Sequence, residues 1–216
     1  MAKLVKSYST ILAVIAIALL VAGGLAIASN MGFKLLYLLY TTGASAKTGT
    51  NWVSLPMNFP FANASDLKTD VGATCTQVSR HIRSTDALQT YTGKAGSPNF
   101  PIEKGHAYII KVNADTNYVI VGSHDPSFGI LLNTTGASAK TGTNWISVPY
   151  HTTASNASEL KSDVGSTCTQ VSRHIRSSDA LQTYTGKAGS PNFPITPGEG
   201  YIIKVNADTT WTPSHY

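Results

Sequence analysis

The sequence predicts a mainly β protein of two tandem homologous domains, each a β-sandwich or partly open barrel with one short helix, preceded by an N-terminal hydrophobic helix. Residues 41–123 recur at 134–216 with an offset of 93 residues and no gap, and about 60 of the 83 aligned positions match. Short apolar runs alternate with turn-forming residues in both copies. The composition, 42% hydrophobic and 12% charged, is typical of a folded chain rather than a disordered one.

The N-terminal segment, residues 1–28, has a different character. Lys3 and Lys6 precede a long apolar stretch, and Ala26-Ile27-Ala28 supplies small residues at the spacing of a signal peptidase site. This predicts a cleaved secretory signal peptide or, because about 17 apolar residues can just span a bilayer, a retained membrane-anchor helix. A pilin-type leader is a third interpretation, since Gly32-Phe33 is similar to a prepilin cleavage junction. Each interpretation places the protein outside the cell or on its surface, with the membrane as a partner only through this segment.

An apolar segment opens each repeat. We expect an N-terminal apolar strand at 29–40, β-repeat 1 at 41–126 and β-repeat 2 at 127–216, with residues 128–133 (FGILLN) as the opening segment of the second repeat. Runs of six to eight apolar residues bounded by turn formers predict buried strands rather than helices.

A strand and a helix are predicted next in each copy. Residues 52–56 (WVSLP) form a short strand that ends at a proline, which cannot donate to a ladder. A helix of two turns is predicted from Asn63, a capping residue, to Gly72. In the second copy Asn156 and Glu159 are closer to a capping box.

The remaining elements are strands. Residues 74–82 alternate with period two, and a turn and a second strand at 87–92 complete a predicted β-hairpin. The alternation places on one face Cys75, Gln77, Ser79 and His81, and on the other face Thr76, Val78, Arg80 and Ile82. Further strands are predicted at 108–112 and 118–121, and around Trp211 in the second copy.

Two motifs carry a resemblance to other proteins. Each repeat opens with Asn-Trp-x-Ser-x-Pro (NWVSLP from Asn51, NWISVP from Asn144) and ends near a Gly-x-x-Tyr strand (KGHAYIIKV, PGEGYIIKV). In these motifs the chain resembles a group of secreted bacterial or archaeal repeat proteins of unassigned role, from about residue 41 to 216. The resemblance implies an extracellular β-module and carries over no catalytic residue. The layout is also similar to donor-strand fibre subunits, in which an N-terminal strand completes a neighbour's sheet.

The two cysteines, Cys75 and Cys168, are repeat equivalents. In an exported protein two cysteines suggest a disulfide, but equivalent points of adjacent domains normally lie beyond the Cα window of about 4.4 to 6.8 Å that a disulfide requires. Three interpretations remain open: two thiols buried in the two cores, a disulfide between subunits, or an intramolecular disulfide.

No combination of residues predicts chemistry. Of six histidines only His81 and His174 repeat, and the sequence contains no HxxxH, HExxH or CxxCH. The consecutive Ser123-His124-Asp125 cannot converge as a triad. Several further motifs favour structural roles: TGKAGS at Thr92 and Thr185, which lacks a phosphate-loop glycine, and the turn aspartates Asp70, Asp115, Asp163 and Asp208. We therefore expect no enzyme, catalytic residue, metal or cofactor, and no nucleic-acid partner because the chain has no basic run.

Three Asn-x-Ser/Thr sequences match the N-glycosylation acceptor pattern, at Asn63, Asn133 and Asn156.

The first functional hypothesis is a non-enzymatic structural protein, a subunit of an extracellular filament or surface layer. An unpaired apolar strand tends to pair with another chain unless it is paired within its own sheet. Addition of a strand to the edge of a neighbour's sheet is a known recognition mode. Head-to-tail contacts of this kind build a homopolymer. The expected subunit interface is formed by Phe33, Leu35, Leu36, Tyr37, Leu38, Leu39 and Tyr40.

The alternative is a cell-surface adhesin or glycan-binding module with a surface glycan as partner. Flat aromatic faces suit sugar rings, and the candidate contacts are Trp52, Tyr91, Tyr184 and Trp211. A competing interpretation places Trp52 and Trp145 in the core. The loops at 57–62 and 150–155 differ most between the copies, which suits different neighbours or different ligands.

Overall fold

The computed structural model describes residues 33–41, 49–56, 58–123, 125, 127–134 and 142–214. The predicted signal peptide or anchor at 1–28 and the histidine of Ser123-His124-Asp125 lie outside these residues. None of the helices in the described ranges has the length and apolar character needed to cross a membrane. Both repeats belong to one compact unit, residues 34–216.

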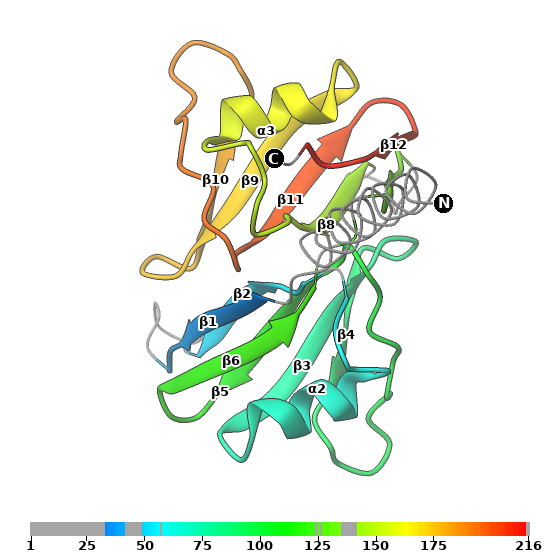
Figure 1. The fold of residues 1–216 in the computed structure, drawn as a ribbon, viewed down its shortest axis with the longest axis vertical. Coiled ribbons are helices and arrows are strands. Elements are labelled where there is room, and N and C mark those ends of the chain that lie inside the picture. Colours follow the sequence, from blue (N-terminus) through cyan, green and yellow to red (C-terminus); the bar gives the residue numbers. More distant parts are fainter. Residues whose placement is uncertain are drawn as a thin grey trace, which may run out of the picture. The chain divides into compact units, whose positions relative to one another are not determined.

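The first repeat consists of a four-stranded sheet, a two-stranded sheet and one helix (Figure 1). In chain order its elements are β1 (Phe33–Leu39), β2 (Thr50–Ser54), α2 (Ala64–Val71), β3 (Cys75–Ile82), β4 (Ala87–Tyr91), β5 (Ala107–Val112) and β6 (Thr116–Gly122). The larger sheet has the antiparallel order β2-β5-β3-β4, and β1 pairs with β6.

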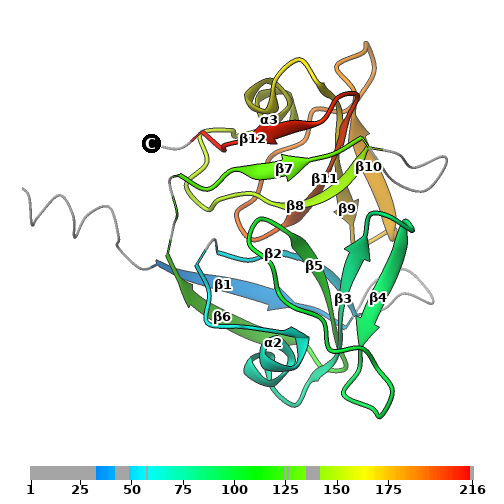
Figure 2. The ribbon, with the colours of Figure 1, turned by 90° about the vertical axis from the view of Figure 1, so that its right-hand side faces the viewer.

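The second repeat has the same topology (Figure 2). Its elements are β7 (Ile130–Leu132), β8 (Thr143–Ser147), α3 (Ala157–Val164), β9 (Cys168–Ile175), β10 (Ala180–Tyr184), β11 (Gly200–Val205) and β12 (Thr209–Trp211). Its sheets have the orders β10-β9-β11-β8 and β12-β7. The prediction of a mainly β protein with two similar units is therefore confirmed.

The helix caps differ from the sequence-based expectation. Before α2, the Asn63 side chain accepts from the backbone N–H groups of Ser65 and Asp66, and the Asp66 carboxylate accepts from the Asn63 N–H at 3.1 Å, which completes a capping box. Before α3, the carboxylate of Glu159 instead accepts from the Ser155 N–H at 2.6 Å. The Asp66 carboxylate also accepts from the Ala62 N–H at 3.0 Å, so both acidic side chains bond to the residue before the cap, and the complete box is described in the first copy.

A β-bulge changes which residues of β3 face the core. The pairing of β3 with β5 shifts register between Cys75 and Gln77, and such an insertion inverts the alternation at that point. Cys75 therefore lies in the core together with Val78, whereas the sequence alternation had placed them on opposite faces. Gln77 and Ser79 stay on the opposite face, which is turned towards the second repeat.

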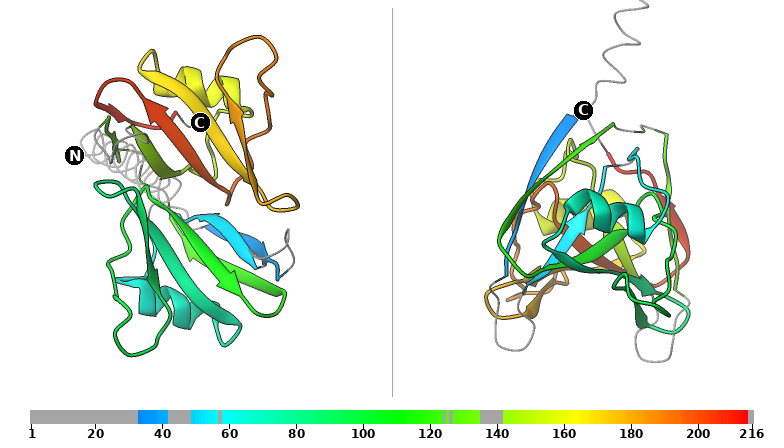
Figure 3. Two further views of the ribbon diagram at one scale, coloured as in Figure 1. Left: turned by 180° about the vertical axis from the view of Figure 1, so that it is seen from behind. Right: turned by 90° about the horizontal axis from the view of Figure 1, so that it is seen from below.

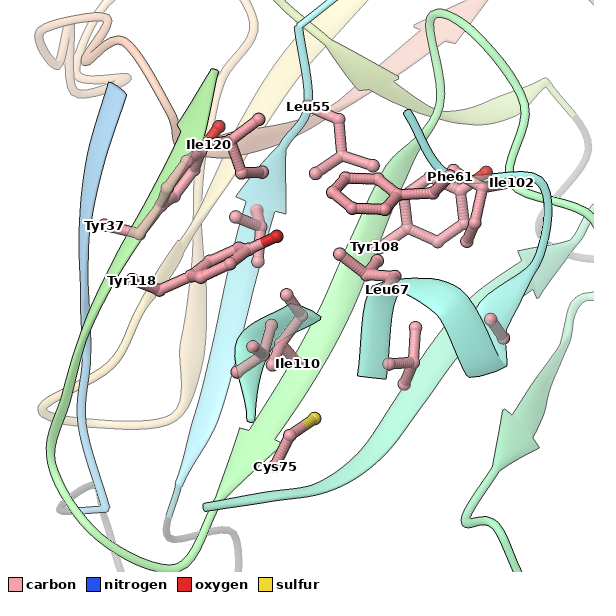
Figure 4. Close-up of a cluster of buried hydrophobic side chains, with 14 of the residues drawn as sticks. Tyr37, Leu55, Phe61, Leu67, Cys75, Ile102, Tyr108, Ile110, Tyr118 and Ile120 are labelled. Atoms are coloured by element: carbon pink, nitrogen blue, oxygen red, sulfur yellow. The ribbon is translucent and has the colours of Figure 1, made fainter. Parts of the chain in front are cut away.

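Each repeat has its own hydrophobic core between the four-stranded sheet on one side and the helix and two-stranded sheet on the other. Figure 4 shows the first core, in which Tyr37 of β1 and Tyr118 of β6 lie beside each other, with ring centroids 5.8 Å apart. The other core residues labelled there are Leu55, Phe61, Leu67, Cys75, Ile102, Tyr108, Ile110 and Ile120.

Strand β1 therefore belongs to the first repeat. Tyr37 and Leu39 are only 6% and 3% exposed, and the Tyr37 hydroxyl donates to the Ser54 carbonyl oxygen at 2.5 Å. This corrects the expectation of an unpaired leading strand: the edge of β6 is available within the same chain, and alternate residues of β1 complete the core beside it. The side chains of residues 33–36 lie outside those described.

The two repeats contact each other through reciprocal pairs. The backbone N–H of Ser54 donates to Gly198 O at 2.8 Å, and its repeat equivalent, Ser147, donates to Gly105 O at 2.9 Å. Gly105 and Gly198 are themselves repeat equivalents. When residue i contacts j and the equivalent of i contacts the equivalent of j in reverse, the interface is isologous and has twofold symmetry. The repeats are therefore related by a pseudo-twofold axis.

Candidate ligand-binding cleft between the two sheets

The tryptophan that occurs in the motif of each repeat, Trp52 or Trp145, lies at this axis. The rings of Trp52 and Trp145 stack with centroids 4.1 Å apart. Each indole also stacks on a histidine of the other repeat, Trp52 on His174 at 5.4 Å and Trp145 on His81 at 5.1 Å. Four aromatic rings, two from each repeat, thus join the two four-stranded sheets.

Beyond this stack the two sheets enclose a cleft of about 660 Å³, a size typical of small-molecule sites. Its walls are formed by β2, β3, β4 and β5 of the first repeat and by β8, β9, β10 and β11 of the second. These strands are labelled in Figure 2, and Figure 3 shows the same ribbon from two further sides. Both walls are the sheet faces that point away from the cores. The cleft is lined by Thr50, Trp52, Gln77, Ser79, His81, Asp86, Leu88 and Ile109 from the first repeat, and by Thr143, Trp145, Gln170, Ser172, His174, Asp179, Leu181, Thr183, Ile202 and Lys204 from the second.

The two walls are chemically similar, although Thr183 and Lys204 line the cleft from the second repeat alone. Eight lining positions are occupied in both repeats, and the residue is identical in each of the eight pairs. Positions that line a smaller pocket near β7, of about 520 Å³, differ more, since Glu103, Lys104 and His106 correspond to Thr196, Pro197 and Glu199. At the eight positions that line the cleft in both repeats, the two repeats therefore have the same residues.

Each wall contains a buried histidine–aspartate pair. The Nε2 of His81 is 2.7 Å from Asp86 Oδ1, and the same distance separates His174 Nε2 from Asp179 Oδ1. The four side chains are between 7% and 9% exposed. Both aspartates have a φ of 55° in the turn after the strand, a left-handed conformation that Asp tolerates better than most residues. The second oxygen of each carboxylate, Oδ2, is buried without a hydrogen-bond partner in the described part of the chain.

Hydroxyl pairs and glutamine amides add neutral polar groups. Ser79 Oγ and Thr90 Oγ1 are 2.8 Å apart, as are Ser172 Oγ and Thr183 Oγ1. Within such a pair one hydroxyl donates, and the other keeps its own proton for a further bond. The side chains of Gln77 and Gln170 line the cleft and have no hydrogen-bond partner among the residues described, so that each offers a donor and an acceptor.

Aliphatic side chains complete the walls. Ile109 and Ile202 are buried. Leu88 and Leu181 are each 52% exposed and lie on opposite walls of the cleft. The cleft thus combines apolar surface with paired donors and acceptors, a combination that suits a neutral ligand with both C–H faces and hydroxyl groups.

The aromatic residues predicted as glycan contacts lie elsewhere than expected. Trp52 and Trp145 are half-buried, neither core residues nor open platforms, because both rings are engaged in the stack. Trp211 is buried and its Nε1 donates to Asp163 at 2.8 Å. Tyr91 and Tyr184 pack against the two cores.

The divergent loops contain core positions. Phe61 and its repeat equivalent, Ala154, are both buried in their cores. Tyr118 and its equivalent, Trp211, are a second compensating pair, because each donates to the equivalent aspartate of the preceding helix. Part of the difference between the copies is therefore a difference in core packing.

The two cysteines are free and lie in separate cores. Burial raises the pKa of both thiols to about 11, so that little thiolate is present near neutral pH. No disulfide joins them within the molecule.

The three candidate glycosylation sites differ in accessibility. Asn63 and Asn156 are partly buried at the helix N-termini, where their side chains cap α2 and α3. Asn133 is buried, and with its amide turned so that the oxygen faces Arg83 it accepts from Nη2 at 3.1 Å. The fold thus presents Asn133 poorly to a modifying enzyme.

No group of three or more histidine, cysteine, aspartate or glutamate side chains in the described ranges is placed to hold a metal ion. Asp115 and Asp208 accept from the backbone N–H and hydroxyl of Thr41 and Thr134, and these hydrogen bonds lower the pKa of both carboxyls. They are turn-stabilising residues.

No family model, curated protein or solved structure matches this chain.

Sequence reasoning did not find this cleft. The sequence does contain part of the pattern that marks the cleft, because Gln77, Ser79 and His81 alternate along one face of a strand and recur unchanged in the second copy. Nothing in the sequence, however, indicates that this face opposes its own repeat equivalent.

Proposed function

We propose that the protein is a non-enzymatic, exported binding protein that holds a neutral, polyhydroxylated ligand, such as a glycan, in the cleft between its two sheets. The supporting observation is the open cleft of about 660 Å³ with two chemically similar walls. Sheet faces that meet in this way normally interdigitate to form a core. Here Leu88 and Leu181 remain half exposed on opposite walls.

The polar groups of the cleft favour hydroxyl groups as binding partners. The amides of Gln77 and Gln170, which are partly exposed, each offer a donor and an acceptor side by side, as neighbouring hydroxyl groups of a sugar require. Ser79 and Ser172 are only 1% exposed and bond to the hydroxyls of Thr90 and Thr183 behind them. Leu88 and Leu181, each 52% exposed, supply apolar surface for the C–H face of a ring. We expect contact with aliphatic side chains rather than stacking on tryptophan, because Trp52 and Trp145 already stack on other rings.

A binding role fits the histidine pairs better than a catalytic one. A nucleophilic mechanism needs a hydroxyl hydrogen-bonded to the imidazole. In the described part of the chain the partner of His81 is Asp86, and the hydroxyl of Ser79 on the same face bonds to Thr90. The pairs therefore act as rigid supports that position the tryptophan stack.

The test is a glycan array followed by calorimetry on the glycans that bind. Leu181→Ala should weaken binding about tenfold, since it removes roughly 1 to 2 kcal/mol of apolar contact from the cleft. Leu131→Ala is the matched control, because Leu131 is 60% exposed on β7 and does not line the cleft. Equal affinities of the two variants, or no array signal for the wild type, would contradict the proposal.

A second candidate, a structural subunit of an extracellular assembly, is supported by exposed apolar residues. Leu38 of β1 and Val121 of β6 lie in one two-stranded sheet, and Leu131 of β7 in the other, and they are 51%, 65% and 60% exposed. Strand exchange would first require release of β1 from its own core, whereas contact through these outer faces would not. Negative-stain microscopy of Leu38→Asp and Leu131→Asp tests this candidate, and filaments of unchanged length would argue against it.

A further inference from the structure

The symmetry of the cleft constrains its ligand. Each pair of identical lining residues places one member on each wall: Gln77 faces the same cleft as Gln170, and Leu88 the same cleft as Leu181. The contacts between the repeats are reciprocal, which makes the relation twofold rather than translational. The axis therefore runs between Trp52 and Trp145 and through the cleft.

This geometry treats two kinds of ligand differently. A ligand with distinct ends, such as a directional sugar chain, presents different groups to two walls that offer the same groups. Such a ligand can form the full set of contacts with only one wall. Rotated by 180° about the pseudo-twofold axis, it forms the same contacts with the other wall and binds equally well. A ligand with its own twofold axis matches both walls at once, so that every contact is made twice.

We propose that the cleft is a twofold site for a twofold-symmetric polyol, of which a disaccharide joined through both anomeric carbons is the chemical type. This inference rests on the proposed function, because it names the ligand class for the same cleft. Such a ligand has two equivalent sets of hydroxyl groups for Gln77 and Gln170, whose amides are otherwise unpartnered among the described residues. Its two ring faces meet Leu88 and Leu181.

The experiment compares trehalose, which is twofold-symmetric, with maltose, which joins the same two glucose units head to tail. Calorimetry should give trehalose a Kd at least tenfold below that of maltose. Gln77→Ala and Gln170→Ala should each weaken trehalose binding about fivefold to tenfold, and the double variant by about the product, 25-fold to 100-fold. Both glutamines are partly exposed, and thermal unfolding of the variants provides the control for folding.

The outcomes separate this inference from the proposed function. A directional ligand that binds in two orientations should lose only about twofold in affinity in each single variant, because the orientation that uses the other glutamine remains. In the double variant it should lose far more affinity than the product of the two single losses. That pattern, or tighter binding of maltose or of another directional array glycan, would overturn the twofold ligand and leave glycan binding intact. Binding of no glycan at all would overturn both.

Discussion

Replacing Leu39 with alanine tests whether β1 belongs to its own repeat. Leu39 is 3% exposed in the first core, whereas its neighbour Leu38 is 51% exposed. Removing a buried leucine side chain costs about 2 to 5 kcal/mol through lost transfer free energy and the remaining cavity. We expect Leu39→Ala to lower the free energy of unfolding by about 3 kcal/mol, or the melting temperature by about 6 to 12 °C for a unit of this size.

The control is Leu38→Ala, which should change the free energy of unfolding by less than about 0.5 kcal/mol. Urea denaturation followed by circular dichroism, at two protein concentrations a hundredfold apart, provides the assay. A strand supplied by the same chain gives midpoints that do not depend on concentration, whereas a strand donated by a neighbour gives midpoints that rise with it. Concentration-dependent midpoints, or equal losses for the two variants, would refute the assignment of β1 to its own repeat.

Four further predictions concern the tryptophan stack, the thiols (two predictions) and the helix cap. Trp52→Ala and Trp145→Ala should each lower the free energy of unfolding by about 2 to 4 kcal/mol. The double variant should lose less than the sum of the two, because each single variant already removes the contact between the two indole rings. Additive losses would contradict the stack. At pH 8 about one in a thousand Cys75 or Cys168 thiols is ionised, so mass spectrometry should show slow alkylation of the native protein and fast alkylation in denaturant; rapid native labelling would show that the thiols are exposed. Because burial raises these pKa values, stability should be retained below about pH 9 and fall as pH rises towards 11, and a free energy of unfolding that stays flat from pH 8 to 10.5 would contradict this. Asn63→Ala should cost about 1 kcal/mol in thermal denaturation through loss of the α2 cap, and an unchanged midpoint would count against the capping box.

Local features of the fold were predictable from the sequence. Apolar runs bounded by turn formers give most of the strands, and Asn63 and Asn156 mark the helix starts, because periodicity and capping are properties of neighbouring residues. The β-bulge at Cys75 was not predictable. It depends on the pairing of β3 with β5, and it moved the thiol to the face opposite the one that the alternation indicated.

The duplication, the order of the elements along the chain and the absence of a recognisable catalytic motif were determined by the sequence alone. The tertiary structure decided where the repeated residues meet. His81 is hydrogen-bonded to Asp86 across a turn, and Trp52 stacks on His174 across the pseudo-twofold axis. The equivalent faces of the two larger sheets form the walls of one cleft. A sequence pattern records which face of a strand is polar, but the partner of that face is set by contacts between residues far apart in the chain. For this protein those contacts, rather than any motif, place the candidate site.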